Sequence, residues 1–273
     1  MLVKDEADII ADTLAHLFEH VDWIYVSDNG SSDATRSIVD SFPAVTLIDD
    51  LEIGYWQSYK TTALAMCASE DGHSWVVPCD ADELWYVAAD PGRRIADFLA
   101  GQAPDVQMVS AELYNHVPTD LDPNKGTVFQ RIGWRKRERG ALPKTACRLH
   151  PSLVIHAGNH HATYDGPALR VGGLCVRHFS WRSAKQYVRK IRNGIVAYAA
   201  TDLPEGTGLH WRMWQRVYEE SGSTLEEIAN HSLRLLGDEV LEEHFRVWFS
   251  ARDPEVHDEM IYDPAPAAPW TQP

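Results

Sequence analysis

Strand and helix patterns alternate along residues 1–90, and this alternation restricts the fold more than any other feature of the sequence. Short apolar runs at 1–4, 22–28, 44–50 and 74–79 are separated by segments whose apolar residues recur at helical spacing. Strands that alternate with helices in this way form a parallel sheet with helices on both faces. The sequence therefore predicts an α/β fold with a mostly parallel, Rossmann-like sheet. Ligands of such sheets bind at the carboxyl ends of the strands.

The second half of the chain predicts a change from strands to helices. Strand patterns recur at four places, 106–116, 146–150, 153–161 and 174–181. A helical pattern begins at Ser183, further helices are expected between 211 and 249, and the chain ends in a Pro- and Ala-rich stretch. We therefore expect three parts: a sheet domain at 1–182, a helical extension at 183–262 and a disordered tail at 263–273.

The composition limits the partners of the protein. A net charge of -15 argues against a nucleic-acid partner, because binding to a phosphate backbone needs clustered Lys and Arg. The four cysteines have neither CxxC spacing nor the density of a disulfide-rich secreted domain, so we expect reduced thiols. The chain enters its strand pattern without a signal peptide, and no apolar run approaches the roughly 18 residues of a spanning helix. We expect a cytoplasmic protein without an integral membrane segment, and its oligomeric state is not predicted.

Three carboxylates, Asp80, Asp82 and Glu83, follow the apolar run at 74–79. Carboxylates this close repel one another unless a cation lies among them. If the strand continued, Asp80 and Asp82 would point to the same side and could share one ion. Carboxylate oxygens suit Mg²⁺ or Mn²⁺, and such ions usually keep positions open for substrate phosphates. A solvated turn is the alternative interpretation of this D-x-D tripeptide, and its position after a buried strand favours the metal.

Four segments occur in an order that points to a known family: MLVKDEADIIADTLAHL, IYVSDNGSSDAT, CDADELW and VRHFSWRS. Taken together they resemble the family 2-type glycosyltransferases with the GT-A fold, in particular the branch with a D-x-D-E motif. The resemblance covers residues 1 to about 195. It implies a metal-dependent, generally inverting transfer of a sugar from a nucleotide-diphosphate donor, with a UDP-sugar favoured. The acceptor is left open and could be a saccharide, a lipid-linked molecule or a small natural product.

The resemblance also implies which residues bind the donor and the metal. The nucleotide-binding residues would be Val3, Asp5, Glu6, Asp28, Gln57, Lys60, Asp80 and Ala81. Among them, Asp28 would hydrogen-bond the base, and Asp5 stands where the family more often has Asn. The metal ligands would be Asp80, Asp82 and His178, with Glu83 supporting the loop. Because imidazole suits Mn²⁺ better than Mg²⁺, Mn²⁺ is the first choice of cofactor and Mg²⁺ the second.

An inverting transfer also needs a general base that takes the proton of the acceptor hydroxyl. In the family this base normally falls between the D-x-D motif and the late histidine, a window that here contains HAGNHHATYDG. His160 is the first candidate, since a histidine titrates near neutral pH, and Asp165 is the second. Glu112 is a further candidate. A polar loop that contacts the acceptor or the backbone is the alternative interpretation of the segment.

Two other enzyme classes share part of this pattern. Metallophosphoesterases use a G-N-H motif, which residues 158–160 provide, but they need a D-x-H and a G-D-x-x-D motif before it, and that order is missing. A nucleotidyltransferase would be expected to have a Gly-rich basic loop after its first strand, where this chain has the acidic segment VKDEAD. A metal-dependent phosphoesterase or nucleotidyltransferase acting on a nucleotide remains the alternative function, and a non-catalytic binding protein is a third.

Overall fold

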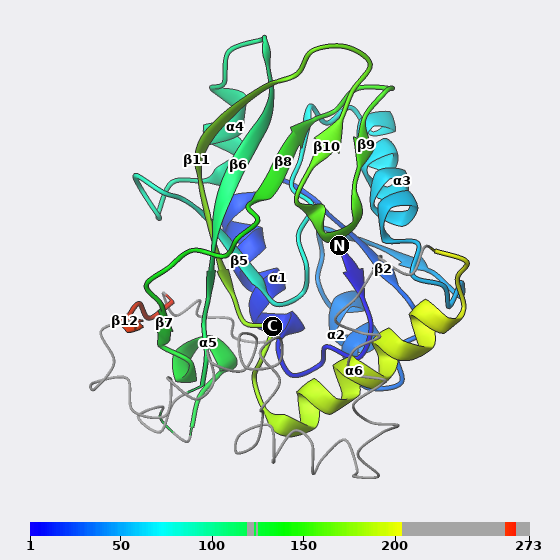
Figure 1. Cartoon of the computed structure of the whole chain (residues 1–273), viewed down its shortest axis with the longest axis vertical. Coiled ribbons are helices and arrows are strands. Elements are labelled where there is room, and N and C mark those ends of the chain that lie inside the picture. Colours follow the sequence, from blue (N-terminus) through cyan, green and yellow to red (C-terminus); the bar gives the residue numbers. More distant parts are fainter. Residues whose placement is uncertain (119–122, 124, 204–259, 266–273) are drawn as a thin grey trace.

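The computed structural model of this chain describes residues 1–118, 123, 125–203 and 260–265. Helices surround two central sheets, one of three strands and one of five (Figure 1). The predicted α/β class is therefore confirmed. The helices predicted between 211 and 249 lie outside the described residues. Among the helices that are described, none combines the length and the apolar character needed to cross a membrane.

The three-stranded sheet is parallel and contains the first strands of the chain. Its order is β1 (Leu2–Val3), β2 (Ile24–Asp28) and β3 (Val45–Asp49). Helices α1 (Ile10–His20) and α2 (Thr35–Asp40) connect these strands in turn. The register pairs Val3 with Asp28 and Asp28 with Asp49, so the carboxyl ends of the three strands meet at one edge of the sheet. The predicted parallel alternation of strand and helix is confirmed here.

The five-stranded sheet is mixed. Its order is β4 (Trp75–Val76), β8 (Lys144–Arg148), β6 (Val106–Asn115), β11 (Leu169–His178) and β5 (Glu83–Val87). Within it, β6 and β11 run parallel and the other three pairings are antiparallel. The prediction of a mostly parallel sheet therefore holds for the first sheet but not for the second. One of the three antiparallel pairings joins β5, which follows the acidic turn, to β11, and the other two join β8 to β4 and to β6.

Shorter elements flank the sheets. Helix α3 (Gln57–Glu70) leads from β3 to β4, and α4 (Ile95–Ala100) leads from β5 to β6. Strands β9 (Val154–Ile155) and β10 (Ala162–Thr163) form a hairpin that is closed by a 3₁₀ turn at Ala157–Asn159. The remaining elements are α5 (Val128–Arg131), β7 (Trp134–Lys136), α6 (Ala184–Ala199) and β12 (Met260–Tyr262), which pairs antiparallel with β7. Helix α6 begins the region that the sequence predicts as a helical extension (Figure 1).

The described residues at the end of the chain lie against the mixed sheet. Asp263 is the first residue of the predicted tail, and its carboxylate lies 2.8 Å from Arg177 and 3.0 Å from Arg135. These two ion pairs hold Asp263 beside β11 and β7. The prediction of a disordered tail stays a prediction for residues 266–273, which lie outside the described part of the chain.

One large apolar cluster holds α1 against the two sheets. Ile10 and Leu14 of α1 are fully buried in it, together with Val26 of β2, Trp85 of β5 and Val176 of β11. Burying each such side chain contributes roughly 1.5–3 kcal/mol before the entropy cost of folding is counted. The cluster therefore keeps the carboxyl ends of β1 and β2 next to the acidic turn that precedes β5.

Candidate active site

The acidic turn at 80–83 is fixed by its backbone. The hydroxyl of Thr13, on α1, donates a hydrogen bond of 2.6 Å to the carbonyl of Ala81, and the amide of Phe179 donates one of 2.8 Å to the carbonyl of Asp82. The carboxylate of Glu83 accepts hydrogen bonds from the amide of Asp80 at 3.1 Å and from the Trp85 indole at 3.0 Å. Glu83 is fully buried and supports the turn, as the sequence resemblance implies.

Asp80 faces β8 and the β9–β10 hairpin. Its Oδ2 lies 2.8 Å from Nζ of Lys144, and the same ammonium lies 2.7 Å from Glu83. Its Oδ1 accepts a hydrogen bond of 3.1 Å from the Asn159 amide. Burial alone would lower the pKa of Lys144, but the two neighbouring carboxylates raise it. Lys144 is therefore a permanent counter-charge of Asp80 and Glu83.

Asp82 faces the other way, toward β11 and α6. Its Oδ2 lies 2.5 Å from Nζ of Lys190 and 3.7 Å from the Arg182 guanidinium. Its Oδ1 lies 3.7 Å from Nε2 of His178. Burial would raise the pKa of Asp82, but Lys190, His178 and Arg182 hold it well below its usual range. Asp82 is therefore an ionised, nearly buried carboxylate.

The position of His178 makes it a metal-ligand candidate. Its Nδ1 lies 2.8 Å from the amide oxygen of Asn115, which can only accept, so Nδ1 carries the proton and Nε2 faces Asp82 with a lone pair. Burial lowers the pKa of His178 to about 4, so the ring is neutral at pH 7. A second ring nitrogen that is held by an amide oxygen is typical of metal-binding histidines. The Asp82 and His178 pair therefore fits a cation such as Mn²⁺.

The two oxygens of Asp80, the third predicted metal ligand, are engaged by Lys144 and Asn159, and its role as a ligand stays a prediction. Across the described ranges, no group of three or more His, Cys, Asp or Glu residues is placed to hold a metal ion. The crowded acids also have protein counter-charges, since Lys144 and Lys190 lie among them. Repulsion among the acids therefore does not by itself require a metal ion. A metal ion beside Asp82 would have that carboxylate and the imidazole of His178 as ligands.

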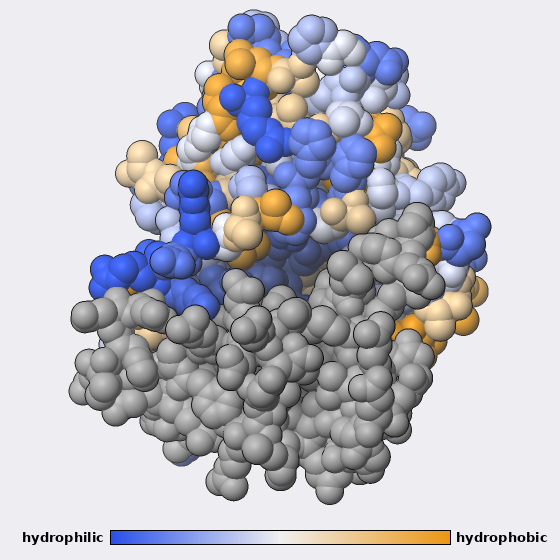
Figure 2. Space-filling model, in the orientation of Figure 1, coloured by the Kyte–Doolittle hydropathy of each residue, from blue (hydrophilic) through white to orange (hydrophobic). Residues whose placement is uncertain are grey.

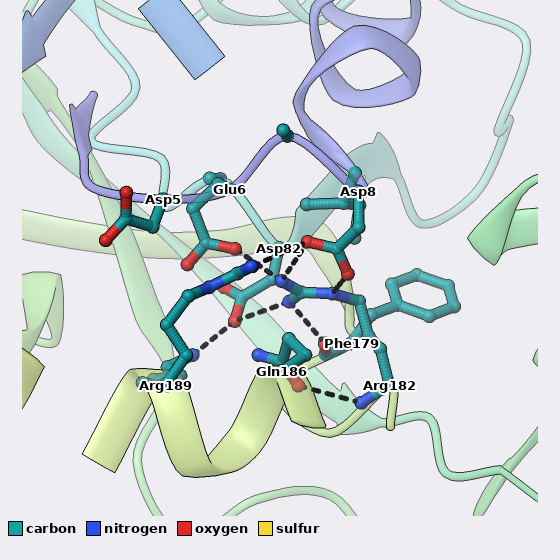
Figure 3. A network of polar contacts seen from close by, with 12 residues as sticks. Asp5, Glu6, Asp8, Asp82, Phe179, Arg182, Gln186 and Arg189 are labelled. Carbon is teal, nitrogen blue, oxygen red and sulfur yellow. Dashed lines mark hydrogen bonds and ion pairs between the residues drawn. The ribbon is translucent and has the colours of Figure 1, made fainter. Parts of the chain in front are cut away.

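Arg182 connects the first loop of the chain to this site. Its guanidinium forms ion pairs with Glu6 and with Asp8, the latter at 2.8 Å, and donates a hydrogen bond of 3.1 Å to the carbonyl of Phe179 (Figure 3). Figure 3 shows Arg182 between these acids and Asp82, beside the start of α6. Sequence reasoning missed Arg182, Lys190 and Lys144. Arg182 lies in RHFSWRS and Lys190 lies in YVRKIRNG, but of this region only His178 is among the predicted site residues.

A cavity of about 190 Å³ lies at the carboxyl ends of β1, β2 and β3. It is lined by five of the predicted nucleotide-binding residues: Val3, Glu6, Gln57, Lys60 and Asp80. Lys190, Asn193, Gly194 and Ala197 form its α6 wall, at the spacing of one helix face. The ammonium of Lys60 lies 2.6 Å from the Asp50 carboxylate, which also lines the cavity. Hydrophilic residues gather toward the middle of the molecular face seen in Figure 2.

The other three predicted nucleotide-binding residues support the loops around the cavity. Asp28 is buried, and its carboxylate accepts a hydrogen bond of 3.3 Å from the amide of Ser31. Asp5 has a positive φ of 57°, a conformation that Asn and Asp tolerate better than most residues. Its carboxylate accepts hydrogen bonds from the Ser32 amide at 2.6 Å and from the Asn193 side chain at 3.0 Å. Ala81 is buried under α1.

The two predicted base candidates lie at different ends of the β9–β10 hairpin. His160 follows the 3₁₀ turn, and its Nδ1 donates to the carbonyl of Pro143 at 3.0 Å, which leaves the lone pair on Nε2. Burial lowers the pKa of His160 and keeps the ring neutral. Asp165 is exposed, and its amide bonds Ser152 at 3.0 Å, at the end of the hairpin away from Asp80. Glu112, the further candidate, forms an ion pair of 2.8 Å with Arg139.

Comparisons with known proteins assign no family to this chain. No protein-family model matches it, and a search of curated proteins found no match. Among solved structures, the chain aligns with the crystal structure of S. aureus TarS 1–349 at 12% sequence identity. The alignment covers 92% of this chain and 77% of that chain, with a TM-score of 0.33. So low a TM-score does not establish a shared fold.

Proposed function

We propose that this chain is a metal-dependent, inverting glycosyltransferase of the GT-A type that uses a nucleotide-diphosphate sugar, with UDP as the favoured nucleotide. The observation that carries the proposal is the cavity at the carboxyl ends of the parallel strands. It is lined by Val3, Gln57, Lys60 and Asp80, and Lys190 on its wall contacts Asp82. Parallel α/β sheets bind their ligands at this edge, and convergent polar groups in a cavity are typical of a substrate site.

Asp82 and His178 are the residues that would hold the divalent ion, with Mn²⁺ preferred and Mg²⁺ as the alternative. When bound, the ion would supply Lewis-acid neutralisation of the charge on the departing diphosphate. The chain itself supplies orientation. Asn115 fixes the His178 ring, and Lys190 and Arg182 keep Asp82 ionised at neutral pH. Glu6 and Arg182 tie the β1–α1 loop to the same corner of the cavity.

His160 is the proposed general base for the acceptor hydroxyl. In its neutral form the lone pair of Nε2 is free to take a proton, because Nδ1 already donates to Pro143. Its neighbour Asn159 is hydrogen-bonded to Asp80, so the turn is connected directly to the acidic residues. The lowered pKa of His160 keeps the basic form populated at neutral pH. The exposed position of Asp165 favours His160 over it.

Donor binding followed by turnover tests the proposal. A panel of UDP-, GDP- and dTDP-sugars is screened for thermal stabilisation with Mn²⁺, since a ligand at 100 times its Kd stabilises a protein by about 2.7 kcal/mol. The stabilising donor is then assayed for release of the nucleoside diphosphate with candidate acceptors. Stabilisation that needs Mn²⁺, together with sugar transfer, supports the proposal. Hydrolysis of a model phosphodiester or nucleotidyl transfer, without sugar transfer, would contradict it and support the alternative classes.

A further inference from the structure

Helix α6 places one ammonium group at the border between the cavity and the acidic turn. Lys190 lines the cavity with Asn193 and Gly194, and its Nζ contacts Asp82 at 2.5 Å. Its side chain is 27% exposed, whereas the side chain of Lys144 is 4% exposed and that of Arg182 is 1% exposed. Among these three cations, Lys190 is therefore the one that a ligand in the cavity can reach most easily.

Lys190 is also held by fewer groups than Lys144 or Arg182. Lys144 bridges Asp80 and Glu83, and Arg182 is held by two carboxylates of the β1–α1 loop and by a backbone carbonyl. Lys190 contacts one carboxylate, that of Asp82, within the described parts of the chain. An ammonium on a flexible four-carbon stem can change partners at lower cost than a guanidinium with several fixed bonds. Lys190 is thus the cation that is able to leave its partner.

If Lys190 leaves, Asp82 keeps the Arg182 guanidinium at 3.7 Å but loses its closest counter-charge. Because a buried carboxylate is costly when its counter-charge is removed, the departure of Lys190 is favoured when another cation takes its place. A divalent ion at Asp82 and His178 would be such a replacement. A diphosphate bound to that ion would at the same time bring phosphate oxygens toward the ammonium of Lys190. The ammonium could then form a charge-assisted hydrogen bond with a phosphate oxygen in place of its contact with Asp82.

We propose that Lys190 is a diphosphate-binding residue that exchanges Asp82 for the donor's phosphate oxygens when the metal binds. This inference rests on the proposed function. Without a nucleotide, Lys190 and the metal ion compete for Asp82. With a nucleotide, the ammonium of Lys190 would bind the diphosphate beside the metal ion that Asp82 and His178 would hold. A purely structural ion pair would also compete with the metal ion, but its removal would leave the affinity for the diphosphate unchanged.

The two states give the variant Lys190→Met effects of opposite sign. Removing the competing ammonium should tighten Mn²⁺ binding in the absence of nucleotide by about tenfold, measured from the EPR signal of free Mn²⁺. Removing a charge-assisted contact to phosphate should weaken UDP binding at saturating Mn²⁺ by roughly tenfold to a hundredfold, measured by calorimetry. The affinity for uridine, which has no phosphate, should stay the same.

Matched variants separate this role from a general effect on folding. Lys185→Met removes an exposed ammonium from the same helix and should change neither affinity. Lys190→Arg retains the charge and should restore most of the UDP affinity. Lys190→Gln removes the charge but keeps a polar side chain, and it replaces Lys190→Met if that variant unfolds at a lower temperature than the wild type.

Two results would overturn the inference, and they are distinguishable. If the wild type binds UDP with Mn²⁺ and transfers a sugar, while Lys190→Met and Lys190→Gln bind UDP as the wild type does, Lys190 is only a structural partner of Asp82 whatever their affinity for Mn²⁺, and the proposed function stands. If the wild type binds no nucleoside diphosphate at all, the proposed function fails and this inference fails with it.

Discussion

The two aspartates of the acidic turn lie two residues apart and have different surroundings. Asp80 faces the mixed sheet, where Lys144 and Asn159 bind both of its oxygens. Asp82 faces α6, where Lys190 is its closest partner and the unprotonated nitrogen of His178 lies beside it. Asp80 lines the cavity and its side chain is 29% exposed, but both of its oxygens have fixed partners. The side chain of Asp82 is only 4% exposed, yet its partner Lys190 lines the same cavity, so an exchange of partners is expected at Asp82.

The two aspartates of this short motif therefore have different expected roles, one structural and one in ligand binding. In the Asp80 half of the motif, the ammonium of Lys144 joins β8 to the acidic turn, and the side-chain amide of Asn159 joins the 3₁₀ turn of the β9–β10 hairpin to Asp80, so these contacts stabilise the fold. In the Asp82 half, Lys190 of α6 and His178 at the end of β11 lie beside the carboxylate, and we propose that this half binds a ligand.

Removing the carboxylate of Asp82 should have the largest effect. Asp82→Asn keeps the shape of the side chain but removes the anionic metal ligand, so sugar transfer should fall by about a thousandfold or more. Initial rates over a Mn²⁺ titration measure the loss. The matched variant Asp80→Asn should retain more activity, because Lys144 and Asn159 already engage the two oxygens of Asp80. If Asp82→Asn transferred sugar at the wild-type rate, the metal assignment would be wrong.

The next effect should come from the hairpin. His160→Asn retains an N–H donor near the carbonyl of Pro143 and removes the basic Nε2, so kcat should fall by roughly 10²–10⁴-fold with UDP affinity unchanged. Asp165→Asn, at the far end of the hairpin, should leave kcat close to that of the wild type. A change in acceptor KM alone for His160→Asn would move the base assignment to another residue.

Lys144→Met should show that the Asp80 half has a structural role. The substitution leaves the carboxylates of Asp80 and Glu83 without their shared cation, which should lower the free energy of unfolding by about 3–5 kcal/mol. Urea denaturation measures this loss. Lys190→Met should cost less, because Asp82 retains the Arg182 guanidinium at 3.7 Å and His178 beside it. Equal losses for the two lysines would remove the distinction between the halves.

Acid should destabilise the Asp82 half through His178. The pKa of this group falls from 6.5 to about 4 on folding because of burial, so the unfolded chain binds the extra proton between these values. The contribution of the neutral ring is therefore complete above pH 6.5 and is lost as the pH falls toward 4, by an amount on the order of 3 kcal/mol. Urea denaturation at pH 7 and pH 4.5 should show a smaller loss for His178→Gln than for the wild type. The same loss in both proteins would contradict the buried, neutral state of His178.

The spacing of apolar residues in the sequence predicted individual helices and strands correctly. The strand expected at 44–50 is found at Val45–Asp49, and the helical spacing between the runs at 44–50 and 74–79 corresponds to α3 at Gln57–Glu70. Gly30, in the turn after β2, has a positive φ of 68°, which glycine adopts without strain. The resemblance also selected five residues that line one cavity, although they come from three separate segments of the chain.

The contacts that distinguish the two aspartates could not be predicted in the same way. Lys144 and Asp80 are 64 residues apart in sequence, and Lys190 and Asp82 are 108 residues apart. No hydrophobic period or turn signal encodes such pairings, because they depend on how β8 and α6 pack against the turn. The antiparallel position of β5 was missed for the same reason, since its partner β11 lies far along the chain.

The central claim is that the Asp82 half binds a metal-linked nucleoside diphosphate. The most direct measurement is calorimetric titration of UDP into the wild type and into Asp82→Asn, each with and without Mn²⁺. We expect the wild type to bind UDP strongly only with Mn²⁺, and Asp82→Asn to lose this dependence on the metal. The claim would be contradicted if Mn²⁺ left UDP affinity unchanged in the wild type, or if both proteins responded to it equally.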